Sequence, residues 1–161
     1  MTFDCLLGEE DLSSLVYRNL QPDTEMPFFS RVFMESVRLQ PGIMYSTPHV
    51  IKKRFTTIIG KKKLEMMPRS VFMLNLFEIH RDPDQWSEPD KFKPERFDPD
   101  LSEYHTTPRH KKRKPYSFSP FFVGTRMCTG RPFAEMTSKA IVNMFVVAFP
   151  DLEFVDEKFK N

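Results

Sequence analysis

One cysteine near the C-terminus is surrounded by residues that suit a metal ligand. In the stretch FFVGTRMCTG, Cys128 follows Arg126 by two residues and lies between two glycines, Gly124 and Gly130. A thiolate, the form of cysteine that binds metals, is stabilised by a nearby cation and by a helix N-terminus. The glycines allow tight turns and close approach to a flat ligand, and Phe121 can shield the sulfur from water. A thiolate ligand of iron requires this combination.

Cys128 also fits other interpretations. A cysteine before an apolar helix is often a buried core residue. A zinc site needs about four ligands, and the four His and two Cys of the chain are not clustered. A cysteine nucleophile would need a His partner, and the spacing identifies none. The only other cysteine, Cys5, is far from Cys128 in the sequence. Two such distant cysteines do not suggest a disulfide scaffold and favour a reducing compartment.

The composition is that of one modest globular domain. Of the 161 residues, 40% are hydrophobic and 29% are charged, which predicts a hydrophobic core. The 14 prolines predict much irregular chain between short elements. The net charge of +2 implies no general affinity for nucleic acid or membranes. The acidic N-terminus is unlike a secretory signal, and the longest apolar run, AIVNMFVVAF, is too short to span a bilayer.

A helix is predicted over 21–42. Pro27 suits its first turn, and the Pro-Gly pair at 41–42 ends it. Glu35 and Arg38 are three residues apart and are therefore neighbours on the helix surface. One face of this helix carries Phe29, Val32, Phe33, Ser36 and Val37.

The cysteine is expected to lie between a proline-rich coil and a second long helix. Apolar residues recur along that helix at steps of three and four, at Phe133, Thr137, Ala140, Ile141, Met144, Phe145 and Ala148. A short helix over 9–20 and a terminal strand over 151–160 are also predicted. The remaining predicted segments are strands with a short helix over 43–80, coil over 81–120, the cysteine loop over 121–130 and the second long helix over 131–149.

Three motifs in order resemble those of the cytochrome P-450 family. The cysteine loop at 121–130 matches F-x-x-G-x-R-x-C-x-G, ESVR at 35–38 resembles the E-x-x-R helix, and PERF at 94–97 resembles the coil motif that follows it. The resemblance implies a mainly α fold with small β-sheets (α+β). The chain, 1–161, would be a single partial domain, the C-terminal part on the proximal side of the heme.

The resemblance implies heme as the cofactor. Cys128 is similar to the proximal iron ligand of the family, and Arg126 matches the arginine that pairs with a heme propionate. Phe121, Gly124 and Gly130 match the other cofactor-binding positions of the loop.

Glu35, Arg38 and Arg96 match a charge cluster that joins helix to coil beneath the heme in the family. Buried charges of this kind are tolerated only when each is paired. The alternative for Glu35 and Arg38 is an ordinary surface pair, but the Phe and Val residues around them favour burial.

The chain departs from the family pattern at several points. Phe122 occupies a position that is small in the family, which predicts crowding of the backbone beneath the heme. His49 is the only candidate for contact with a second propionate, and a solvated histidine at the start of a strand is the alternative. The acid–threonine pair that activates oxygen is missing, since the resemblance covers about the last third of a family member.

The function implied by the resemblance is that of a heme-thiolate monooxygenase, which inserts one oxygen atom into an organic substrate. This chain is expected to be a fragment that needs the missing N-terminal portion or a partner chain, and neither a catalytic residue nor the substrate can be identified. A non-catalytic structural or assembly protein that retains the scaffold is the alternative. The family relation allows association with the endoplasmic reticulum or the mitochondrial membrane.

The basic stretch RHKKRKP is predicted to be a solvated loop, as charge runs usually are. Docking of an acidic electron donor, such as a reductase, is the functional interpretation, and a nuclear-import signal is a third. Its basic residues are Arg109, Lys111, Lys112, Arg113 and Lys114.

Overall fold

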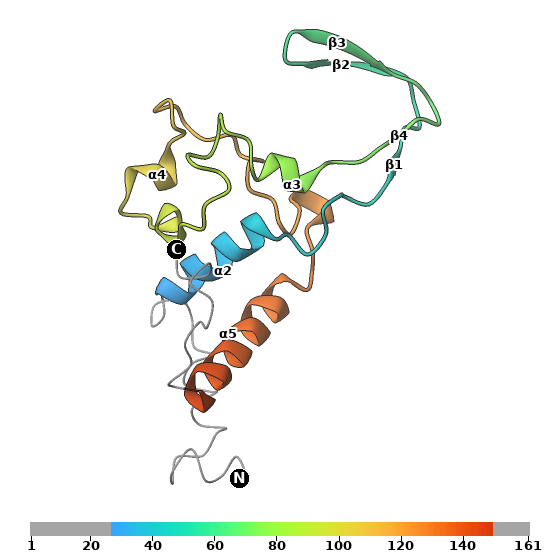
Figure 1. The fold of residues 1–161 in the computed structure, drawn as a ribbon. Helices are drawn as coiled ribbons and strands as arrows, with labels where there is room; N and C mark the ends of the chain where they lie inside the picture. Colours follow the sequence, from blue (N-terminus) through green and yellow to red (C-terminus); the bar gives the residue numbers. More distant parts are fainter. Residues whose placement is uncertain (1–26, 150–161) are drawn as a thin grey trace.

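Short helices and two small sheets are separated by long irregular segments. The computed structural model of the protein describes residues 27–149, so the predicted helix over 9–20 and strand over 151–160 lie outside the described residues. The mixture of helices and small sheets is the predicted α+β architecture (Figure 1). Its elements are α2 (Pro27–Leu39), β1 (His49–Val50), β2 (Phe55–Ile59), β3 (Lys62–Met66), β4 (Val71–Phe72), α3 (Leu76–Ile79), η2 (Pro94–Phe97), α4 (Ser102–His105), η3 (Gly124–Arg126) and α5 (Arg131–Ala148).

The buried side of α2 is charged. Glu35 and Arg38 are completely buried, whereas Ser36, from the largely apolar face named above, is exposed. The other members of that face are only half-buried: Phe29, Val32, Phe33 and Val37. Ion pairs to the coil therefore hold the charged side of this helix, while its apolar face is only partly covered.

Two antiparallel pairs of strands follow α2. β1 pairs with β4, so that His49 lies opposite Phe72. β2 pairs with β3 through a register that runs from Phe55 opposite Met66 to Ile59 opposite Lys62. Gly60 makes the turn between them with φ of +62°, a left-handed conformation that suits glycine. The β2–β3 hairpin extends away from the helices (Figure 1).

The segment predicted as coil, 81–120, contains two single helical turns. They are the 3-10 turn η2, which begins at Pro94, and the four-residue helix α4. The prediction missed them because one turn is too short to carry a periodic apolar pattern. η2 places Arg96 against Glu35 of α2, and α4 places Glu103 against Arg96.

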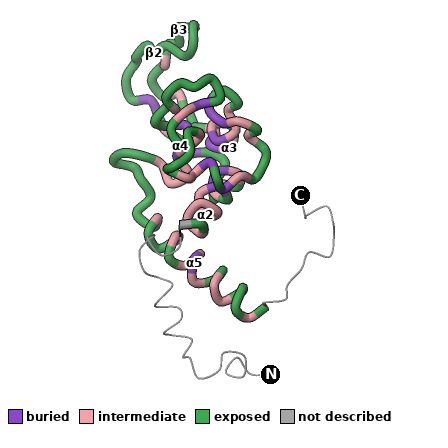
Figure 2. Tube along the Cα trace, turned by 90° about the vertical axis from the view of Figure 1, so that its left-hand side faces the viewer, coloured by how far each residue is buried: buried purple, intermediate pink, exposed green. Residues whose placement is uncertain are grey.

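The hydrophobic core within residues 27–149 is small. Its buried apolar side chains are Ile51, Leu76 and Trp86, and buried polar or charged groups outnumber them. Figure 2 shows the buried positions gathered around α3 and the coil beside it. The expectation of an ordinary hydrophobic core is therefore not met in the described residues.

Much apolar surface lies on α5. Phe133 is 67% exposed and Ile141 is 60% exposed, although both belong to the predicted apolar face. Phe145 is also exposed, while Thr137, Ala140, Met144 and Ala148 are half-buried. Within residues 27–149, no helix combines the length and apolar character needed to cross a bilayer.

We expect Leu76→Ala to destabilise the protein much more than Leu74→Ala. Leu76 is 1% exposed and Leu74 is 45% exposed. Truncation of a buried leucine costs about 2–5 kcal/mol, and an exposed one usually changes stability by about 0.5 kcal/mol or less. Chemical unfolding of the two variants measures the difference. Equal losses would show that the buried cluster around α3 does not stabilise the fold.

Candidate functional site

A buried ion-pair cluster joins α2 to the coil. The Glu35 carboxylate receives two hydrogen bonds from Arg38, from Nε at 2.7 Å and from Nη2 at 2.8 Å. Arg96 of η2 donates through Nε to the same carboxylate at 3.0 Å. A fourth donor is the backbone N–H of Lys93, at 2.9 Å. All three charged side chains predicted for this cluster are fully buried, so the surface-pair alternative for Glu35 and Arg38 is excluded.

The two guanidinium groups also bind backbone carbonyls. Arg38 donates through Nη1 to His80 at 2.8 Å and to Pro89 at 2.6 Å. Arg96 donates to the Ser87 carbonyl at 3.0 Å and to the Glu103 carboxylate at 2.8 Å. Glu103 supplies the second negative charge, so two arginines face two carboxylates. The sequence motifs did not indicate Glu103, because it comes from a separate helical turn, α4.

The cysteine loop is held by backbone bonds near its two ends. The N–H of Cys128 donates to the Phe121 carbonyl at 2.8 Å. Between them, Gly124 and Phe122 both lie in the left-handed region, with φ of +66° and +59°. The left-handed conformation costs a non-glycine residue about 1–2 kcal/mol, so Phe122 is strained. The loop leaves Cys128 exposed, as a free thiol, just before α5 begins at Arg131.

Phe121 packs on α2. Its ring stacks on that of Phe33, with 6.3 Å between the ring centroids and 14° between the planes, and Arg131 lies over it at 5.8 Å. The expectation that Phe121 shields the Cys128 sulfur is not met, because the ring turns toward Phe33 and the cysteine stays exposed.

His80 connects the buried cluster to the cysteine loop. Its side chain is completely buried, and its Nε2 accepts a hydrogen bond from the backbone N–H of Ser119 at 3.0 Å. Ser119 precedes Phe121 by two residues, and the His80 carbonyl is one of the acceptors of Arg38. We infer that His80 is a positioning residue. Neither charge nor spacing in the sequence pointed to His80, apart from its place in the IHRDP stretch.

The His80 ring is neutral. Burial, together with the nearby charges of Arg38 and Arg81, lowers the pKa of His80 from 6.5 to about 4. Because Nε2 accepts a hydrogen bond, the ring proton is on Nδ1, which has no partner among the described residues.

The other predicted site residues are spread along the chain. Arg126 is exposed, and its guanidinium makes no ion pair within residues 27–149. Gly124 and Gly130 flank the thiol, and a side-chain carbon at Gly130 would lie 3.7 Å from the Cys128 sulfur. His49 is in β1, where its ring stacks on Phe72 with 5.1 Å between centroids. No hydrogen bond joins His49 to the cysteine loop in the part of the chain that the structure describes.

The basic loop is only partly free for a partner. Arg113 is half-buried, stacks over Trp86 at 4.0 Å and donates to the carbonyls of Glu103 and Thr106. Burial lowers the pKa of Arg113. Arg109 is exposed and pairs with Asp84 at 2.8 Å. Arg113 therefore stabilises the coil, which is a correction to its predicted place on a docking surface.

A family model described as cytochrome P450 matches residues 18–158 of the chain. The chain belongs to the cytochrome P450 family. Heme is the cofactor that this membership implies, and monooxygenase-type chemistry and reductase partners are the general properties of the family.

Individual P450 relatives agree with the family match. The chain is 31% identical over 144 residues to cytochrome P450 4d2 of Drosophila melanogaster, covering 89% of this chain and 25% of that protein. It is 31% identical over 145 residues to cytochrome P450 4F4 of Rattus norvegicus, covering 89% and 25%. Salutaridine synthase of Papaver somniferum is 30% identical over 154 residues, covering 86% and 29%. The chain spans about a quarter of the length of these curated relatives.

A solved structure shows the same fold. The chain superposes on retinoic acid-bound cyanobacterial CYP120A1 with a TM-score of 0.64 and 26% identity, covering 91% of this chain and 33% of that one. The described residues fit the P450 heme by their chemistry. They present a free thiol at Cys128, an exposed guanidinium at Arg126, and exposed apolar side chains at Val123, Met127 and Phe133.

We expect Arg96→Ala to destabilise the protein strongly. The substitution removes one of the two cations from the buried Glu35 carboxylate, and breaking a buried pair costs about 3–5 kcal/mol. Arg54→Ala is the matched control, because the Arg54–Glu65 pair is exposed and such pairs contribute about 0–1 kcal/mol. Soluble yield and thermal unfolding are the measurements. An unchanged melting temperature for Arg96→Ala would contradict an essential cluster.

Stability should fall on acidification because of His80. Between pH 6.5 and about 4 the unfolded chain binds a proton at this histidine that the folded chain excludes, so the free energy of unfolding decreases by up to about 1.4 kcal/mol per pH unit. His80→Gln keeps a hydrogen-bond acceptor for Ser119 and cannot be protonated. Unfolding measured from pH 7 to pH 4 should therefore show a shallower decrease in the variant. Parallel curves would mean that His80 does not titrate differently in the folded chain.

Proposed function

We propose that the chain, 1–161, is a single partial domain that supplies the thiolate side of a heme-dependent monooxygenase. The observation that carries the proposal is the presentation of Cys128. Its sulfur is exposed and unpaired by any disulfide, and its backbone is fixed by the bond to Phe121. The thiol is thus available to a ligand while its main chain is held in place.

The remaining residues of the loop have roles that follow from their chemistry. Arg126, an exposed guanidinium, would bind a heme propionate through paired hydrogen bonds. Gly130 keeps a side chain away from the sulfur, and Gly124 permits the left-handed turn of the loop. His49, in β1, is the weaker candidate for a second propionate, since its ring is stacked on Phe72. Phe121 contributes by packing the loop on α2.

When bound, heme supplies the activation of dioxygen and the transfer of one oxygen atom to an organic substrate. The chain's own residues hold the iron ligand and orient it. The cluster of Glu35, Arg38 and Arg96 would hold the coil in place. His80, which accepts a hydrogen bond from the Ser119 N–H, would connect the coil to the cysteine loop. A thiolate donates electron density to the iron that it binds.

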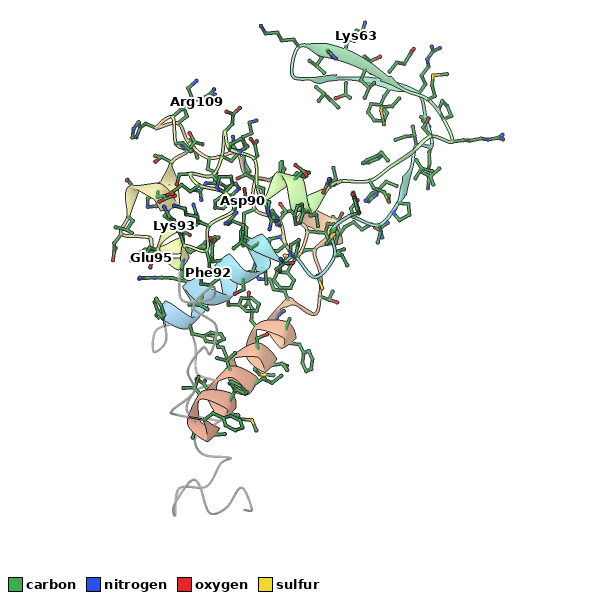
Figure 3. The ribbon with its side chains drawn as sticks, in the orientation of Figure 1. Lys63, Asp90, Phe92, Lys93, Glu95 and Arg109 are labelled. Atoms are coloured by element: carbon green, nitrogen blue, oxygen red, sulfur yellow. The ribbon has the colours of Figure 1, made fainter. Side chains whose placement is uncertain are left out.

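An electron-donor reductase would dock through the basic loop. Lys112 and Lys114 line an open groove of about 580 Å³ together with Arg31 of α2. Arg109 and Lys111 are exposed beside it, and Figure 3 shows Arg109 at the outer edge of this loop. An acidic partner surface matches these charges, and association should weaken with added salt.

A non-catalytic structural or assembly protein is the second candidate function. The observation that favours it is the extent of the match, since the chain covers about a quarter of its relatives' length. A protein of this kind would keep the buried cluster without using Cys128. The two functions differ in whether the chain binds heme.

We expect Cys128→Ser to abolish the spectrum of thiolate-bound heme. Purified chain is mixed with hemin, reduced and exposed to carbon monoxide, and the band typical of thiolate ligation is recorded. Cys5→Ser, which removes the other cysteine, should leave the band unchanged. Loss of the band in both variants, or in neither, would argue against Cys128 as the ligand, and absence of heme from the wild-type chain would favour the non-catalytic protein.

Oxygen transfer by the chain alone should be poorly coupled. Productive oxygen chemistry needs an enclosed, dry pocket, and Cys128 is exposed. With NADPH and a competent reductase, most of the reducing equivalents should appear as peroxide, and little product should form from a substrate panel. Addition of an N-terminal P450 segment should raise the product formed per NADPH. Tight coupling by the 161-residue chain alone would contradict the need for a further segment.

A further inference from the structure

The first strand of the β2–β3 hairpin carries a threonine that follows a run of basic residues. The stretch KKRFTT places Lys52, Lys53 and Arg54 before Thr56, with Arg54 two residues ahead of the hydroxyl. Protein kinases select their substrates by charge patterns around the acceptor hydroxyl, and one class of them selects cations directly before it. The pattern is not sufficient by itself, because charge runs are usually solvated surface. Burial and geometry decide whether such a hydroxyl can react.

Thr56 is accessible in the folded chain. Its side chain is exposed on β2, and its hydroxyl makes no hydrogen bond within residues 27–149. Thr57, the next residue, is half-buried and lies opposite Leu64. Successive residues of a strand point to opposite faces, so the two hydroxyls differ in their surroundings. Thr56 is the one that a second protein reaches more easily.

The hairpin itself is suited to enter the cleft of another protein. β2 and β3 form a separate two-stranded sheet, which extends away from the helices (Figure 1). A kinase binds the residues around its acceptor in an extended conformation, and β2 is already extended. An isolated two-stranded hairpin is only marginally stable in water, so separation of β2 from β3 requires little free energy.

Ser117 shows that the charge pattern alone does not make an accessible site. The run KKRK at 111–114 ends three residues before Ser117. This hydroxyl is enclosed, since Ser117 is 5% exposed and its Oγ donates to the Lys114 carbonyl at 2.8 Å. Within residues 27–149, only Thr56 combines an exposed hydroxyl with a run of three basic residues just before it.

We propose that Thr56 is a phosphorylation site for a serine/threonine kinase that selects basic residues ahead of its acceptor. The Thr56 Oγ1 attacks the γ-phosphorus of ATP, and the bond from that phosphorus to the bridging oxygen breaks. ADP leaves, and the hydroxyl proton passes to a base of the kinase. Lys53 and Arg54 bind carboxylates beside the kinase cleft, because opposite charges across an interface determine the choice of partner.

The phosphate would lie beside an existing ion pair. Thr56 is opposite Glu65 in the register, and the Glu65 carboxylate pairs with Arg54 at 2.5 Å. A phosphothreonine carries a charge of about −1.5 to −2 at pH 7 and three acceptor oxygens, and like charges directly across two strands destabilise the pairing. The phosphate and Glu65 therefore compete for Arg54. The modification also lowers the positive charge of the segment 52–69, which has seven basic residues and one acidic residue.

Phosphorylation of the 161-residue chain in solution tests the proposal. The native chain is incubated with ATP labelled at the γ-phosphate and with cAMP-dependent protein kinase or protein kinase C, and mass spectrometry of its peptides locates the phosphate. Thr56 should be labelled. Thr56→Ala should lose nearly all of this label, Thr56→Ser should keep it, and the matched control Thr57→Ala should be labelled like the wild-type chain. Absence of phosphate at Thr56 with both kinases would overturn the proposal.

Two lysine variants test how the site is recognised. Lys53→Gln should lower kcat/KM for labelling about tenfold, because a cation that faces the kinase carboxylates is lost. Lys63→Gln removes the same charge from β3, the other strand of the hairpin (Figure 3), and should leave kcat/KM nearly unchanged. Equal losses in the two variants would show that the net charge of the hairpin directs the kinase, and recognition of the residues before Thr56 would be wrong.

Heat-denatured chain separates the charge pattern from accessibility. Denatured chain should gain phosphate at Ser117 as well as at Thr56, whereas native chain should be labelled at Thr56 without Ser117. Equal labelling of the two hydroxyls in the native chain would contradict the selection of Thr56 by exposure. The experiments use no heme, so their outcome is independent of the proposed function.

Discussion

The Glu35 carboxylate, shared by two buried guanidinium groups, is the interaction on which the rest of the described structure depends. Arg38 approaches it from the same helix and Arg96 from the coil, so one anion joins segments that are distant in the sequence. The remaining donors of both arginines bind carbonyls or a second carboxylate. Transfer of such charges from water is costly unless every one is paired. Within residues 27–149, these ion pairs and hydrogen bonds join the segments that apolar packing joins in most protein cores.

The site of a P450 thiolate depends on this cluster through a short series of contacts. Arg38 binds the carbonyl of His80, the His80 ring accepts the Ser119 N–H, and the chain then enters the cysteine loop. Phe121 adds a direct contact with α2 through Phe33. The loop is therefore attached to the helix at two points, although Cys128 itself is exposed. The main chain of the loop is therefore held in place while the sulfur stays accessible.

The sequence predicted the long elements and the motif residues better than it predicted burial. Proline and glycine at 41–42 and an apolar repeat after 131 marked α2 and α5, because backbone restrictions and helical spacing are local properties. Glu35, Arg38 and Arg96 could be named from their motifs, but their partner Glu103 could not, since pairing across the fold leaves no local pattern. The apolar repeat predicted an apolar face on α5, and Phe133 and Ile141 of that face are exposed. Periodicity shows that a helix has an apolar face, and the rest of the fold decides whether that face is covered.

Arg38 and Arg96 bind the coil mainly through its backbone carbonyls. The amino-acid sequence of the coil is therefore less constrained than its path. The carbonyl oxygens of His80, Ser87, Pro89 and Lys91 accept from Arg38 or Arg96, and every amino acid offers the same oxygen. Side chains at 89 and 91 can therefore change between related proteins while the path of the chain stays the same. A region without regular secondary structure can in this way keep its shape over long evolutionary times with little sequence identity.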